Sequence, residues 1–187
     1  MKGWLGTWIE ADKKCASAVK GTFKKELEEE SLKLVNKFVT AENVEDLFDE
    51  AKTPINLDVL SIDIDSNDFW VWKKIVKYKP KIVIIEYNAF IPCDVNWIMK
   101  YDKDKVWDSD TVFNSSLKSL KTLGDEKGYR LVACCLNGVN AFFVRKDLIN
   151  DKFAILNIED IYQPIRYYLK RDLTVVKGFQ RSSQSNG

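Results

Sequence analysis

Two short apolar runs constrain the fold of this chain most strongly. Residues 57–64 read LDVLSIDI and residues 81–87 read KIVIIEY. Both runs have the length of a strand, and nearly continuous apolar residues are typical of strands buried on both faces of a sheet. A helical pattern at residues 66–79 separates the two runs. We therefore expect an α/β protein in which these runs form neighbouring strands.

The remaining sequence continues this alternation of strand and helix patterns. Further strands are expected at residues 5–10, 32–39, 129–136 and 139–145, and helices at 12–32, 41–51, 115–127 and 156–170. Such alternation predicts a mostly parallel sheet with helices on both faces. Asn137-Gly138 predicts a tight hairpin, which makes the last strand antiparallel. We expect one domain over residues 1–150, a helical extension over 151–180 and a disordered tail over 181–187.

Composition excludes several classes of function. The 187 residues include no histidine, which removes Ser-His-Asp and Cys-His catalysis and makes a zinc site improbable. Lysine and arginine number 29 against 28 acids, so no overall charge attracts nucleic acid or an anionic membrane. The four cysteines form no CxxC pair, and the chain has neither a membrane-length apolar run nor a signal-peptide pattern. We expect a cytoplasmic protein.

Acidic and amide side chains follow the two buried strands. Asp63, Asp65 and Asp68 come directly after the first strand, and Glu86 and Asn88 end the second. In open α/β sheets, ligands bind beyond the carboxyl ends of strands, so these residues are candidates for a site. Clustered carboxylates need a cation, a donor or a shared proton, and their oxygens suit magnesium. The alternative is a surface turn in which water screens the charges.

Five segments together resemble the FkbM-like family of S-adenosylmethionine-dependent methyltransferases. They are GWLGTWIEAD, TAENVEDLF, LDVLSIDIDSNDFWVWK, KIVIIEYNAF and KGYRLVACCLNGVNAFFVRKDL, in that order over residues 3–148. The resemblance implies a Rossmann-like three-layer sandwich with a seven-stranded sheet and a C-terminal antiparallel hairpin. It also implies methyl transfer to an oxygen of a small or carbohydrate-like acceptor.

The same resemblance implies roles for individual residues. Glu10 lies where the family's ribose-binding acid lies, and Ala11 lies near the adenine. Residues 40–43, with Glu42 and Asn43, are implied to lie near the adenine as well. Asp63 is implied to lie near the methionine end of the cofactor.

Metal binding and catalysis are assigned to neighbouring positions. Some related O-methyltransferases bind magnesium through residues that Asp63, Glu86 and Asn88 resemble in position, although Tyr87 separates the last two. Because the chain has no histidine, Asp63, Asp65 or Glu86 is expected to orient or deprotonate the acceptor.

One departure from the family pattern has structural consequences. The sequence has no GxGxG turn, and its first segment resembles the family's second strand. The family's first strand lies between the strands that end here at Glu10 and Asp63, so the chain resembles an N-terminally truncated member. We expect weak or absent cofactor binding. We also expect either that the two flanking strands close up or that exposed strand edges produce a homodimer.

Two other functions remain open on the sequence. An apolar strand followed by Asp63-x-Asp65 is also the metal-binding signature of nucleotide-sugar glycosyltransferases. The absent glycine-rich turn alternatively fits a non-catalytic remnant that forms oligomers.

Overall fold

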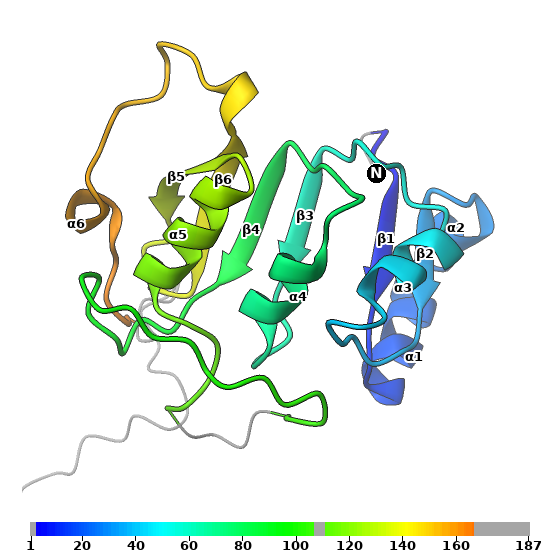
Figure 1. Ribbon diagram of the computed structural model, residues 1–187. Helices are drawn as coiled ribbons and strands as arrows, with labels where there is room; N and C mark the ends of the chain where they lie inside the picture. The colour runs from blue at the N-terminus through cyan, green and yellow to red at the C-terminus, as the bar shows by residue number, and fades with distance from the viewer. Residues whose placement is uncertain (1–2, 107–110, 167–187) are drawn as a thin grey trace, which may run out of the picture.

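The computed structural model describes residues 3–106 and 111–166, and these residues form two separate sheets (Figure 1). The smaller sheet pairs β1 (Gly6–Ile9) with β2 (Leu32–Val35) in parallel. The larger sheet has the order β3-β4-β6-β5. Its strands are β3 (Val59–Ile62), β4 (Ile82–Glu86), β5 (Tyr129–Cys134) and β6 (Asn140–Arg145).

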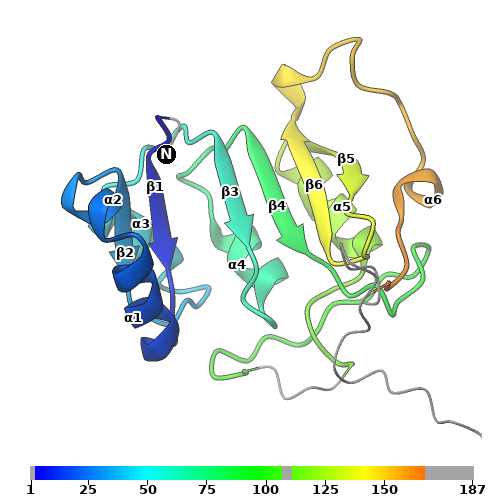
Figure 2. The same cartoon turned by 180° about the vertical axis from the view of Figure 1, so that it is seen from behind.

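The helices are short and cover the two sheets unequally. They are α1 (Lys13–Thr22), α2 (Lys24–Glu28), α3 (Val44–Glu50), α4 (Asp68–Lys74), α5 (Leu117–Glu126) and α6 (Ile158–Ile161), with a 3-10 turn at Lys146–Leu148. Helices α4 and α5 lie over one face of the larger sheet, whereas Figure 2 shows no described helix across β3 and β4 on the other face. None of the described helices is long and apolar enough to cross a bilayer.

The expectation of a mostly parallel, Rossmann-like three-layer sandwich is wrong. Only one of the three pairings in the larger sheet is parallel, because the hairpin inserts β6 between β4 and β5 and antiparallel to both. The two remaining parallel strands form their own sheet, and β1 makes no ladder with β3. The strands that flank this break therefore do not close up within the described chain. The outcome is a mixed α/β fold with two small sheets.

The predicted hairpin is confirmed, but its loop is longer than the two residues Asn137-Gly138, because β5 ends at Cys134 and β6 begins at Asn140. Gly138 has a φ of 73°, in the left-handed region that glycine adopts without strain. A Cβ at this position would lie 2.4 Å from the carbonyl oxygen of Pro164, so the chain after α6 packs directly on the turn. The Arg166 N–H donates to the carbonyl of Asn137 at 2.9 Å and holds this segment in place.

The core lies between the larger sheet and helices α4 and α5. Trp72 of α4 packs against Phe143 of β6 with ring centroids 4.8 Å apart, and both side chains are almost fully buried. Gly124 of α5 lets that helix approach the same ring, since a Cβ there would lie 2.7 Å from Phe143. This packing fixes the helices against the strands, and so fixes the loops at the carboxyl ends of β3 and β4.

Most of the expected elements are shorter in the structure, and two of them differ most. The helix expected at residues 12–32 is divided into α1 and α2 at Phe23. Of the helical extension expected at 151–180, the described part contains only the four-residue α6. Residues 167–180 and the expected tail at 181–187 lie outside the described residues.

Candidate functional site

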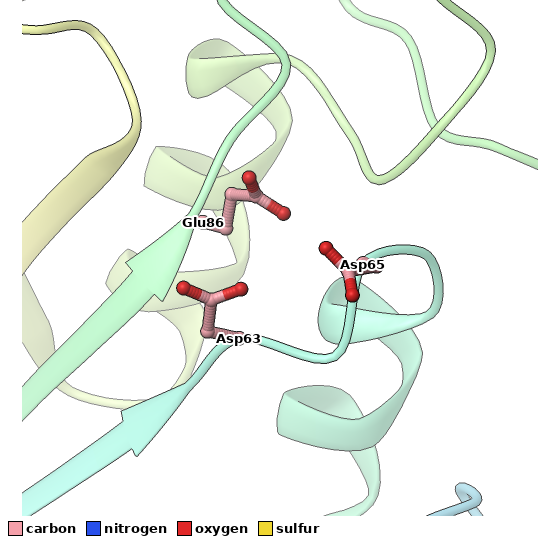
Figure 3. A group of neighbouring side chains, drawn as sticks. All are labelled: Asp63, Asp65 and Glu86. Carbon is pink, nitrogen blue, oxygen red and sulfur yellow. The ribbon is translucent and has the colours of Figure 1, made fainter. Parts of the chain in front are cut away.

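The candidate site lies where β3 and β4 end. Parallel pairing sets Ile62 opposite Ile85, so the residues that follow both strands emerge at the same edge. Asp63 comes directly after β3, Asp65 lies in the turn before α4, and Glu86 is the last residue of β4. One carboxylate oxygen from each of these three acids lies within 4.8 Å of the others (Figure 3). We call these three residues the acidic cluster.

The turn between β3 and α4 places the second acid. Asp65 has a φ of 65°, a left-handed conformation that is uncommon outside glycine, asparagine and aspartate. Buried Asp68 holds this turn, because its carboxylate accepts hydrogen bonds from the N–H groups of Ile64 at 3.2 Å and Ser66 at 3.3 Å. Asn67 precedes α4 but makes no capping bond with its side chain. Asp68 is therefore the residue that positions the loop carrying Asp65.

The carboxyl groups of the site favour protonation or the binding of a cation over carrying unpaired negative charges. Burial, and then the charges of the neighbouring acids, raises the pKa of Glu86 to about 8. Burial is also the main reason that the pKa of Asp68 rises to about 7. Partial desolvation and the charge of Asp65 raise the pKa of Asp63. Among residues 3–106 and 111–166, no lysine or arginine forms an ion pair with the acidic cluster.

Asn114 supports the site and was missed by the sequence reasoning. Its buried side chain donates to Glu86 Oε2 at 2.6 Å, and its Oδ1 accepts from the N–H of Asp68 at 3.3 Å. Its backbone N–H donates to the carbonyl of Ser66 at 3.0 Å. Asn114 therefore ties β4 to the turn before α4. No sequence signal marks it except that asparagine tolerates the left-handed φ of 53° found there.

Asn88 lies close to β4 in sequence but is engaged elsewhere. Its amide donates to the carbonyls of Thr111 at 2.8 Å and Phe113 at 3.0 Å, and its oxygen accepts from the N–H of Phe90. The side chain is fully buried. These bonds occupy both ends of the amide, so the structure brings Asp65, rather than Asn88, together with Asp63 and Glu86.

Glu10 and Ala11 lie at the junction between β1 and α1. The Glu10 carboxylate accepts from the N–H of Asp12 at 2.8 Å. The carbonyls of Glu10 and Ala11 both accept from the side-chain amide of Asn36, at 2.7 and 3.2 Å. These bonds shape the turn that follows β1 and leave the second oxygen of Glu10 without a hydrogen bond among the described residues.

Glu42 and Asn43 lie in the loop before α3. The Tyr101 hydroxyl donates to Glu42, which holds the pKa of that carboxylate below its usual range. The Asn43 side chain accepts from the N–H of Thr40 at 2.8 Å and donates to the carbonyl of Phe38 at 2.9 Å. These contacts organise the loop, and none of them joins Glu42 or Asn43 to the acidic cluster.

A groove of about 1160 Å³ connects the two sheets. The facing strands β1 and β3 line it along their length, together with Val39 and with Asp63, which follows β3. We call it the inter-sheet groove. Asp63 is the residue of the acidic cluster that also lines the groove.

No family model, curated protein or solved structure matches the chain. The site is therefore argued from its own geometry. The resemblance to FkbM-like methyltransferases remains a prediction from sequence segments.

Proposed function

We propose that Asp63, Asp65 and Glu86 bind a divalent cation, and that this centre serves the transfer of a group to an oxygen of a small or carbohydrate-like acceptor. The observation that carries the proposal is the convergence of three carboxylates within 4.8 Å from two strand ends. Nothing in the described part of the chain neutralises them with a basic side chain. Mg²⁺ or Mn²⁺ fits the donor set, because hard cations prefer oxygen ligands and tolerate water at the remaining positions.

The chemistry of the residues supports a transfer to oxygen. A bound divalent cation polarises an acceptor hydroxyl and lowers its pKa. Asp63 and Asp65 are exposed and so face an incoming acceptor, while Glu86 is half-buried behind them. Because the chain has no histidine, a carboxylate of this cluster is the available general base and can accept the hydroxyl proton.

The first candidate reaction is methyl transfer from S-adenosylmethionine, which the sequence resemblance favours. The acceptor oxygen would lose its proton to a carboxylate and form a bond to the methyl carbon. The bond between that carbon and the donor sulfur would break, and S-adenosylhomocysteine would leave. The sequence expectation of weak cofactor binding belongs to this proposal, because the chain has no glycine-rich turn to hold the methionine end.

The second candidate is a nucleotide-sugar glycosyltransferase, and one observation favours it. Asp63 and Asp65 are two residues apart, and the left-handed conformation of Asp65 brings both carboxylates to one point. A cation held in this way suits the diphosphate of a nucleotide sugar. The glycosyl bond to the diphosphate would then break as a new bond forms to the acceptor oxygen.

Calorimetric titration separates these possibilities. We expect Mg²⁺ and Mn²⁺ to bind the whole chain with about one site, and Asp65→Asn and Glu86→Gln each to weaken binding by at least about tenfold. Asp104→Asn is a matched control for the loss of an acid elsewhere. S-adenosylmethionine and UDP-glucose are then titrated with and without Mn²⁺. Binding of UDP-glucose only with Mn²⁺ would favour glycosyl transfer, and absence of cation binding would remove the whole proposal.

A further inference from the structure

The inter-sheet groove is bounded by two strands that do not pair with each other. Residues 3–9, which include β1, form one wall, and residues 56–64, which include β3, form the other. Figures 1 and 2 show β1 and β3 side by side and pointing the same way, with this break between them. Between the walls, α3 contributes Val44 and Phe48 and α4 contributes Val71. The groove is therefore bordered by strand edges with these apolar side chains between them, and Glu30, Lys33 and Lys52 also line it.

Both strand edges present unpaired backbone groups to the groove. On β1, the N–H of Gly6 donates to Ser31, the residue before β2, and the N–H of Glu10, the residue after β1, donates to Val35 of β2. Because backbone groups of successive residues point to opposite sides of a strand, those of Thr7 and Ile9 point away from β2, toward the groove. On β3, the carbonyl of Asp58 accepts from Ile82 of β4 at 2.9 Å. Alternation then turns the N–H and C=O groups of residues 59 and 61 toward the groove. None of these backbone groups has a hydrogen-bond partner among residues 3–106 and 111–166.

We propose that an extended strand of a partner polypeptide binds in the inter-sheet groove and pairs with both β1 and β3. The size of the groove agrees with this occupant. A strand rises about 3.3 Å per residue, and it occupies about 4.8 Å within the sheet and about 10 Å through it. A strand of seven residues, the length of the wall at residues 3–9, then fills roughly 1,100 Å³. The groove measures about 1160 Å³. Addition of a strand to exposed sheet edges is a common mode of peptide recognition.

The charges of the walls define the chemistry of this strand. Residues 3–9 and residues 59–62 carry no charge, and the charged residues Glu30, Lys33 and Lys52 line the groove outside these two segments. An acid stands at each end of the second wall, Asp58 at one end and Asp63 at the other. A charged side chain that faces Val44, Phe48 and Val71 would be buried against apolar groups, which is costly. The partner strand is therefore uncharged over about seven residues and apolar on the face toward Val44 and Phe48, and a basic residue suits the end beside Asp63.

Two other occupants fit less well. Each of the six described strands is already paired along at least one edge, so none from a second copy can pair with both walls without leaving its own sheet. Residues 167–187 lie outside the described part of the chain, and their sequence contains no run of seven uncharged residues. The inference does not depend on the proposed cation site, although the strand would end beside Asp63.

Amide hydrogen exchange of the full 187-residue chain, measured by NMR, tests whether the backbone amides that face the groove are unpaired. We expect fast exchange at Thr7, Ile9, Val59 and Ser61, and slow exchange at the paired amides of Gly6 and Glu10. These two amides serve as internal controls on the same strand. Slow exchange at the first four residues in dilute protein would mean that the chain fills its own groove. Slow exchange only in concentrated protein would mean that a second copy does, and either result overturns the proposal.

A display library of random heptapeptides then supplies the probe. We expect selection of uncharged, proline-free sequences with alternating apolar residues, and we expect a synthetic selected peptide to slow exchange at the four groove-facing amides by at least tenfold. Ser61→Pro removes one groove-facing N–H that the β3-β4 ladder does not use, and it should weaken the peptide at least tenfold. Ser61→Ala keeps that N–H and should bind as wild type does. Failure to enrich any peptide, or equal binding by both variants, overturns the proposal. If Ser61→Pro does not fold, the exchange measurement with the wild-type chain decides alone.

Discussion

Replacing Glu86 with glutamine changes how the stability of the chain depends on pH. Burial, and then the charges of Asp68, Asp63 and Asp65, raises the pKa of Glu86 from 4.5 to about 8. A carboxyl group whose pKa is higher in the folded state leaves stability unaffected below about 4.5 and lowers it as pH rises toward 8. Glutamine keeps the shape and an acceptor for Asn114 but carries no charge. Wild type should therefore lose stability with rising pH relative to Glu86→Gln.

The magnitude follows from the two pKa values. At about 1.36 kcal/mol for each pKa unit, the change from 4.5 to about 8 corresponds to roughly 4 to 5 kcal/mol for Glu86 alone. The neighbouring carboxyl groups titrate together with it and share the repulsion, so we expect about 2 to 3 kcal/mol.

Urea unfolding at about pH 5 and about pH 8.5, with a chelator present, measures this difference. The variant should gain about 2 to 3 kcal/mol on wild type between the two pH values. Glu126→Gln, which replaces an exposed acid at the far end of α5, should follow wild type. If wild type and Glu86→Gln show parallel pH profiles, the electrostatic account of the cluster is refuted.

Three further substitutions test the packing and the supports of the site. Gly124→Ala should destabilise the chain by about 1 to 3 kcal/mol in thermal unfolding, because its Cβ would meet Phe143 at 2.7 Å. Gly21→Ala is the control: it has open space around it in α1 and should stabilise the chain by a few tenths to about 1 kcal/mol. Equal effects of the two substitutions would contradict this packing. Asn114→Ala should cost about 1 to 3 kcal/mol in urea unfolding, since it removes the donor to the half-buried carboxylate of β4, and an unchanged midpoint would contradict that role. Asn88→Ala should lower stability by a similar amount but leave the calorimetric Mg²⁺ affinity within about twofold of wild type, whereas loss of Mg²⁺ binding in a folded variant would make this residue a ligand.

The sequence predicts the local elements of the site better than it predicts the sheet. The apolar runs at residues 57–64 and 81–87 do form neighbouring parallel strands, and they bring Asp63, Asp65 and Glu86 together at one edge. This prediction is correct because the strand, helix, strand order over residues 57–87 favours parallel pairing of two successive strands, and because the end of each apolar run is visible in the sequence. Strand order is not visible in the same way.

The sheet was mispredicted because pairing depends on partners distant in the sequence. Alternation of strands and helices indicates which segments are strands, but it does not show that β1 and β3 remain unpaired or that the hairpin places β6 beside β4. The roles of Asn114 and Asn88 were hidden for a related reason. The bonds that give each its role join it to residues more than 20 positions away, although the Asn88 oxygen also accepts from the nearby N–H of Phe90.

The affinity for Mn²⁺ as a function of pH, measured by electron paramagnetic resonance on the whole chain, tests the central claim most directly. A cation that binds the acidic cluster must displace the proton that Glu86 holds, with its pKa of about 8. For one such proton, the apparent affinity should increase roughly 50-fold between about pH 6 and pH 8. In Glu86→Gln the affinity should be weak and nearly independent of pH. Absence of Mn²⁺ binding, or the same pH-independent affinity in both proteins, would contradict the assignment of these carboxylates as a cation site.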